Sequence, residues 1–99
     1  MPKLPLLLLL PLVACASSEV EENFEAGDRH FRMGQFHDAH RSYLNAAEEV
    51  DRPSDELLAR TEEARFRSIL QSAETRIHLN EINEALQLLD FAEAERPGY

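Results

Sequence analysis

The distribution of apolar residues divides the chain into two parts. Residues 4–13 are apolar throughout, interrupted only by two prolines, and follow a start that carries Lys3 and the amino terminus. A basic head, about ten apolar residues and small residues behind them form the pattern of a secretory signal peptide. The run is too short to cross a bilayer, which needs roughly 20 apolar residues as a helix. The pattern therefore predicts an export signal and not a membrane span.

Downstream of this segment, apolar residues recur at helical spacing, and no strand-like alternation occurs. Ala39, Tyr43 and Ala46 follow one another at i, i+4 and i+7, which places them on one helix face. The intervening sequence is rich in Ala, Leu, Glu and Arg, which favour helices. We therefore expect an all-α domain. Its longest helix should cover residues 55–79 behind Ser54 as N-cap, with a largely polar first half that projects beyond the other helices.

The only cysteine, Cys15, follows the apolar run directly, and a single cysteine forms no internal disulfide. The sequence Leu-Val-Ala-Cys over residues 12–15 resembles the bacterial lipobox. This resemblance implies cleavage before Cys15 and a diacylglycerol on its sulfur. Because Ala16 and not Asp follows, it also implies an outer-membrane lipoprotein that faces the periplasm. The alternative is an ordinary secretory signal that is cut after Ala16.

These features predict three segments. Residues 1–14 would be the lipoprotein signal peptide, residues 15–22 the lipidated N-terminus with a flexible tether, and residues 23–99 a helical domain. Short polar and acidic residues such as those of segment 16–22 are typical of tethers.

A repeated pattern runs through the helical part. Its first copy consists of Gly27, Gly34, Phe36, Ala39, Tyr43 and Ala46. Its second copy consists of Ala73, Asn80, Ile82, Ala85, Leu89 and Ala92. Both copies resemble tetratricopeptide repeats, which implies two helical hairpins, a fragment of an α-solenoid. The copies are 85 − 39 = 46 residues apart, whereas the regular period is about 34 residues. A generic amphipathic helical bundle is the alternative.

Three positions of the repeat have a physical requirement. Gly27 should lie where two helices approach so closely that no side chain fits. Gly34 and Asn80 should end helices in the left-handed conformation, which Gly and then Asn tolerate best.

Charge and motif content exclude several functions. The chain has 10 basic and 19 acidic residues, a net charge of −9, so a nucleic-acid partner is not expected, because phosphate binding needs Lys and Arg. His37 and His40 are i, i+3 neighbours, but no third metal ligand is in register with them. The sequence contains no nucleophile triad, phosphate loop or HExxH motif. We therefore predict no enzyme activity, no catalytic residue, no cofactor and no metal site.

In tetratricopeptide proteins, the first helices of the repeats line a concave groove that binds peptides or partner helices. The resemblance implies a groove formed by Glu21, Phe24, Asp28, Phe31, Arg32, Arg67, Leu70, Glu74, Ile77 and His78. This mixed apolar and acidic lining favours a basic or apolar segment over an acidic C-terminal tail. For Phe31 and Leu70, packing inside the domain is the alternative.

The last helix leaves Leu88 and Phe91 on a side that a following repeat would cover. We expect these two residues at a protein interface. The leading hypothesis is a membrane-tethered adaptor for a protein partner in envelope assembly or secretion. The alternatives are a small structural lipoprotein that self-associates as a homo-oligomer, a piece of a longer repeat protein, and a metal or small-ligand carrier that uses the histidines.

Overall fold

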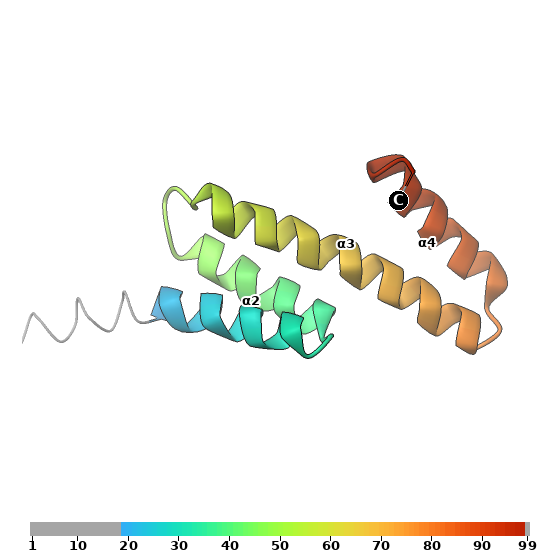
Figure 1. Ribbon diagram of the computed structural model, residues 1–99, viewed down its shortest axis with the longest axis horizontal. Coiled ribbons are helices and arrows are strands. Elements are labelled where there is room, and N and C mark those ends of the chain that lie inside the picture. The colour runs from blue at the N-terminus through green and yellow to red at the C-terminus, as the bar shows by residue number, and fades with distance from the viewer. Residues whose placement is uncertain (1–18, 99) are drawn as a thin grey trace, which may run out of the picture.

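The computed structural model describes residues 19–98, and these are all-helical (Figure 1). A helix over residues 19–32 is followed by α2 (Phe36–Glu48), α3 (Asp55–His78) and α4 (Ile82–Glu95). The all-α prediction is confirmed. The predicted signal peptide and the lipidation site at Cys15 lie outside the described residues.

The four helices form two hairpins, the first from helix 19–32 and α2 and the second from α3 and α4. Helix 19–32 and α2 pair side by side, and the first part of α3 lies against this hairpin, while α4 folds back along the second part of α3 (Figure 1). Two contacts fix this register: Gln71 donates to the carbonyl oxygen of Gly34 at 2.8 Å, and Arg65 pairs with Glu95 at 2.6 Å. The first part of α3 therefore packs against the first hairpin, and its second part packs against α4.

The helix ends follow the local sequence. Gly34 and Asn80 have φ angles of +76° and +61°, the left-handed conformation that ends helix 19–32 and α3. The Ser54 hydroxyl accepts a hydrogen bond from the backbone N–H of Leu57 at 3.1 Å and so caps α3. These three predictions are confirmed, and α3 ends one residue before the predicted Leu79.

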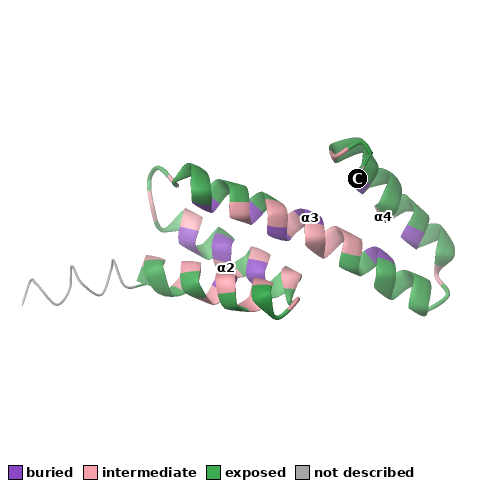
Figure 2. Cartoon of the chain, in the orientation of Figure 1, coloured by how far each residue is buried: buried purple, intermediate pink, exposed green. Residues whose placement is uncertain are grey.

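The core of the first hairpin depends on one close approach. Tyr43 is 2 % exposed, and its ring lies against the backbone of Gly27. A Cβ at position 27 would lie 2.4 Å from a Tyr43 ring carbon, so only glycine fits, as predicted. Ala39 and Ala46 are fully buried on the same face of α2, where small side chains let the helices touch (Figure 2).

The first half of α3 does not project into solvent, and that prediction was wrong. Leu57, Thr61, Ala64 and Phe66 are buried. Leu57, Thr61 and Ala64 lie four and three residues apart, so one narrow line of buried side chains faces the hairpin, while Phe66 lies on the α4 side of the helix. The many charges hid this line in the sequence.

Helix 19–32 already includes residues 19–22, which the sequence analysis had placed in the tether. Val20 packs against the core cluster, which gives this first turn a partner. The helical domain therefore starts before residue 23, where the sequence pattern had placed its beginning.

The packing of α4 also differs in part from the predicted stripe. Ala85 and Ala92 are buried, but Ile82 and Leu89 remain 46 % and 38 % exposed. Because α4 packs mainly on α3, the two small residues form the contact line and the larger ones lie at its edges. None of the helices in residues 19–98 is long and apolar enough to cross a membrane.

Candidate partner groove

A groove runs between helix 19–32 and α3, and its central part is a pocket of about 390 Å³. The residues that line it are Asp28, Phe31, Arg32, Tyr43, Arg60 and Glu63. Asp28 joins the two walls. Its carboxylate accepts hydrogen bonds from the Arg60 guanidinium at 2.6 and 2.7 Å and from the Tyr43 hydroxyl at 2.5 Å.

Burial and the Asp28 carboxylate stabilise the neutral phenol at the base of this pocket. Burial, followed by the hydrogen bond to Asp28, raises the pKa of the Tyr43 hydroxyl well above its ordinary value. Tyr43 is thus a permanent donor to Asp28. The Arg60 guanidinium also lies 4.7 Å from the centre of the Phe24 ring, a cation–π distance. The floor of the groove satisfies its own charges and holds the two helices in register.

The remaining charges of the central groove differ in their availability. Glu63 is held by Arg67 at 2.9 Å and Arg96 at 2.7 Å. Arg32 is exposed and has no ion pair within residues 19–98. A ligand in the groove therefore meets one uncompensated cation above a neutralised floor.

We expect the Glu63 ion pairs to make the stability of the fold depend on pH. The hydrogen bonds from Arg96 and then from Arg67 lower the pKa of Glu63 below its ordinary value of 4.5. A carboxylate with a depressed pKa stabilises the fold above its unfolded pKa, and this contribution is lost as the pH falls through the folded pKa. The melting temperature of the wild type should fall as the pH drops below about 4.5. Glu63→Gln should melt lower at neutral pH and lose less on acidification, and parallel pH profiles would contradict this.

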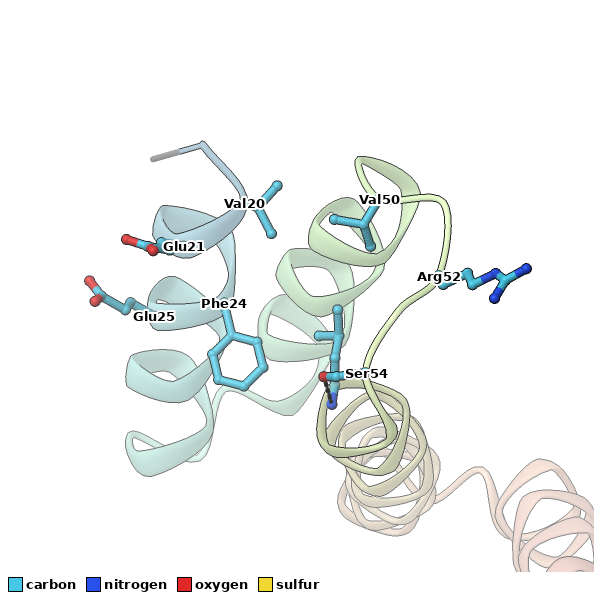
Figure 3. A pocket seen from close by; sticks show the side chains of 8 residues that line it. Val20, Glu21, Phe24, Glu25, Val50, Arg52 and Ser54 are labelled. Atoms are coloured by element: carbon cyan, nitrogen blue, oxygen red, sulfur yellow. Dashed lines mark hydrogen bonds between the residues drawn. The ribbon is translucent and has the colours of Figure 1, made fainter. Parts of the chain in front are cut away.

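Beyond the central part, the groove ends in an apolar pocket of about 380 Å³ beside the loop between α2 and α3. Val20 and Phe24 contribute from helix 19–32, Val50 from the loop and Leu57 from α3. Figure 3 shows Val20 and Val50 facing each other across this pocket above Phe24, whereas the carboxylates of Glu21 and Glu25, which also line the pocket, point outward from helix 19–32. We call this the apolar end pocket.

Only half of the predicted groove set comes together. Helix 19–32 supplies its predicted members: Glu21, Phe24, Asp28, Phe31 and Arg32. The α3 members do not join them: Arg67, Leu70, Glu74, Ile77 and His78 lie farther along α3. Because the additional turns of α3 pack against the hairpin, the wall opposite helix 19–32 is formed by Leu57, Arg60 and Glu63 instead.

The displaced residues have other surroundings. Leu70 lies with Phe66, Leu89 and Ala92 on the α4 side. Phe31 packs edge-on against Phe36 with ring centres 5.0 Å apart. Internal packing, the alternative for Phe31 and Leu70, is therefore what the structure contains, and Phe31 also reaches the groove.

The last turns of α3 carry three further residues of the predicted groove set, and all three are exposed. Glu74 and His78 are exposed neighbours whose carboxylate and ring lie 3.7 Å apart. Ile77 is 49 % exposed. These three belong to no groove with helix 19–32.

Nine residues that line the two pockets are absent from the predicted set: Val20, Glu25, Tyr43, Val50, Arg52, Ser54, Leu57, Arg60 and Glu63. For Leu57 and Arg60, the sequence did contain a signal. Ser54 marks the start of α3, and the two residues follow it on consecutive turns, beside the hairpin.

Two of the histidines, His37 and His40, lie near basic side chains. The His37 ring lies 3.3 Å from the Arg41 guanidinium. Burial, followed by the charge of Arg65, lowers the pKa of His40. Within residues 19–98, no three His, Cys, Asp or Glu side chains are grouped as metal ligands would be.

Leu88 and Phe91 lie together on the outer side of α4. They line an open depression of about 540 Å³ with Arg76, Glu81, Glu84 and Gln87. Phe91 is 52 % exposed, and Leu88 is half-buried. We call this the α4 depression.

The comparisons with known proteins give no relative whose role could be transferred to the groove or to the α4 depression. No protein-family model, curated protein or solved structure matches the chain. The likeness to tetratricopeptide repeats stays a hypothesis that the residue pattern supports.

Proposed function

We propose that this chain is a lipid-anchored adaptor that holds a protein partner in the groove between helix 19–32 and α3. The anchor would be Cys15, and the site of action would be the periplasmic face of the bacterial outer membrane, in envelope assembly or secretion. The observation that carries the proposal is the groove itself. Its floor is braced by the Asp28–Arg60 pair, while Arg32 and the apolar end pocket remain open to a ligand.

A braced floor with open walls suits binding more than chemistry. A groove that is already formed loses little entropy when a ligand arrives, which favours affinity. The floor groups Asp28, Tyr43 and Arg60 saturate one another, so none of them is poised as a base or nucleophile. The groove can therefore position a peptide without transforming it.

The anchor is tested at Cys15. Cys15→Ser should abolish metabolic labelling with a fatty acid and leave an unprocessed or soluble species, because a serine cannot accept the thioether-linked lipid. Ala16→Asp serves as the matched control and should keep the label. Retained labelling of Cys15→Ser would contradict the lipid anchor.

The partner is tested by chemical crosslinking in the native envelope, followed by mass spectrometry. Arg32→Glu reverses the one open charge of the central groove and should reduce the yield of the crosslinked partner severalfold. Arg41→Glu makes the same charge change on an exposed position of α2 and should keep the yield. Equal yields from the wild type and Arg32→Glu would place the partner outside this groove.

Self-association is a second candidate function, because the α4 depression leaves a large aromatic side chain half exposed. Neighbouring exposed apolar residues mark contact sites. Changing Leu88 and Phe91 together to Ser should leave the helical circular dichroism nearly intact and should abolish any dimer seen by light scattering. A loss of the helix signal would instead place both residues in the internal packing of α4.

A further inference from the structure

The apolar end pocket is the part of the groove whose chemistry is most specific. Its walls are the side chains of Val20, Phe24, Val50 and Leu57, and Leu57 is only 3 % exposed at its base. A volume of about 380 Å³ falls in the range of small ligand sites and has room for a few apolar side chains. The occupant must therefore present an apolar group.

The surroundings of this pocket are strongly acidic. Residues 19–25 and 48–56 form the same end of the helical domain, and together they contain nine acidic residues and one basic residue. The acidic residues are Glu19, Glu21, Glu22, Glu25, Glu48, Glu49, Asp51, Asp55 and Glu56. The single base, Arg52, is one of the residues that line the pocket, and in Figure 3 its guanidinium points away from Val20 and Phe24.

Most of these carboxylates are free to meet a ligand. Glu49 accepts a hydrogen bond from Asn23, and Glu56 pairs with Arg60. Glu21 and Glu25, which line the pocket, are exposed and have no ion pair within the described chain. The field at the pocket mouth is thus negative and favours cationic ligands.

We propose that the apolar end pocket binds a basic segment of the protein partner, in which an apolar anchor side chain is flanked by Lys or Arg. This inference rests on the proposed adaptor function and adds the chemistry of its ligand. The anchor side chain enters between Val20 and Val50, and the flanking cations pair with Glu21 and Glu25. Farther along the groove, Arg32 accepts an acidic residue of the same segment.

The same charges disfavour other occupants. The negative field repels an acidic peptide, and it also repels an anionic lipid surface. Position 19 is 19 − 15 = 4 residues from Cys15, so a lipid on Cys15 would keep position 19, which directly precedes the pocket residue Val20, within about 14 Å of the anchor. The pocket would then bind the partner segment close to the membrane, while the negative charge of the pocket keeps the pocket away from anionic headgroups.

The test measures binding of a defined peptide to the full chain. A fluorescent amidated peptide, Lys-Lys-Leu-Phe-Lys-Lys, is titrated against the protein in neutral phosphatidylcholine vesicles, where the lipid offers the peptide no anionic site. Fluorescence anisotropy should report saturable binding that weakens as salt is raised, because salt screens exposed charges. The peptide with its lysines replaced by glutamates, and the peptide with its Leu-Phe replaced by Ser-Ser, should bind at least about tenfold more weakly.

Two pairs of substitutions separate charge from apolar contact. Changing Glu21 and Glu25 together to Gln should weaken binding about three- to tenfold, because two exposed ion pairs are lost. Changing Val20 and Val50 together to Ser should weaken it about tenfold or more. The matched control changes Asp90 to Asn and Glu93 to Gln on α4, which removes the same two charges at the opposite end of the domain and should leave binding unchanged.

Melting curves show whether each variant is folded, and the charge pair tests the pocket even if the valine pair fails to fold. Equal binding of the acidic and basic peptides, or wild-type binding by the Glu21 and Glu25 variant, would overturn the inference. A photoreactive side chain at position 50 that crosslinks to phospholipid and not to the peptide would overturn it in favour of the membrane. If these results come while Arg32→Glu still reduces partner crosslinking in the envelope, the adaptor function stands and only this ligand is wrong.

Discussion

Ala39→Arg is expected to unfold the helical domain. Ala39 is fully buried on the face of α2 that contacts its neighbours, beside Tyr43 and Ala46. Overfilling such a site costs about 1–3 kcal/mol, and a buried guanidinium without a partner adds several more. A domain of about 80 residues has a stability of only about 4–12 kcal/mol. Far-ultraviolet circular dichroism of Ala39→Arg should therefore show most of the helix signal lost.

Arginine substitutions at two further alanines give comparisons for this result. Ala85→Arg introduces the same side chain at a buried position of α4. Because α4 packs mainly on α3, we expect this variant to detach α4 and keep the first hairpin, with a smaller loss of signal. Ala94→Arg makes the change at an exposed position of α4 and should melt within a few degrees of the wild type. A wild-type melting temperature for Ala39→Arg would show that the helix register is wrong.

Gly27→Ala should destabilise the domain by about 2 kcal/mol, although alanine is the better helix former by up to about 1 kcal/mol. The added Cβ would lie 2.4 and 2.5 Å from two ring carbons of Tyr43, and real Cβ contacts are almost never this short. The ring cannot easily move, because it is buried and its hydroxyl is bonded to Asp28. Chemical denaturation would measure the change in the free energy of unfolding.

A double-mutant cycle identifies the cause of that loss. With Tyr43→Leu in place, the clashing ring is gone, so Gly27→Ala should cost less than it does in the wild type. Glu22→Ala, an exposed change on the same helix, should alter stability by less than about 0.5 kcal/mol. Additive effects of Gly27→Ala and Tyr43→Leu would show that the two residues do not meet.

The features that the sequence predicted well are those decided by one residue and its local geometry. Gly34 and Asn80 end helices because their backbones reach the left-handed conformation, and Ser54 caps α3 with its own hydroxyl. Gly27 was expected where two helices approach closely, and the structure supplies the reason, because the Tyr43 ring lies against its backbone.

The features that the sequence did not predict depend on which helices meet. The first half of α3 is rich in charges, and its buried line of Leu57, Thr61 and Ala64 is too narrow to stand out. Once this line packs on the hairpin, Arg60 and not Arg67 faces Asp28. The groove wall on α3 follows from this tertiary contact, which is why half of the predicted set was displaced.

The apolar end pocket depends in the same way on a loop that no periodic pattern describes. Val50 stands in the connection between α2 and α3, and its place opposite Val20 follows from how that loop crosses the end of the hairpin (Figure 3). The acidity of this end, in contrast, is legible in the sequence as two runs of carboxylates.

Site-specific photo-crosslinking in living cells tests the adaptor function most directly. A photoreactive phenylalanine analogue replaces Phe31, which lines the groove beside the retained Arg32, and, in a separate strain, Arg41 on the exposed side of α2. We expect light-dependent products with one or a few envelope proteins from position 31 and none of these from position 41. The absence of products from position 31, or the same products from both positions, would contradict an adaptor that works through this groove.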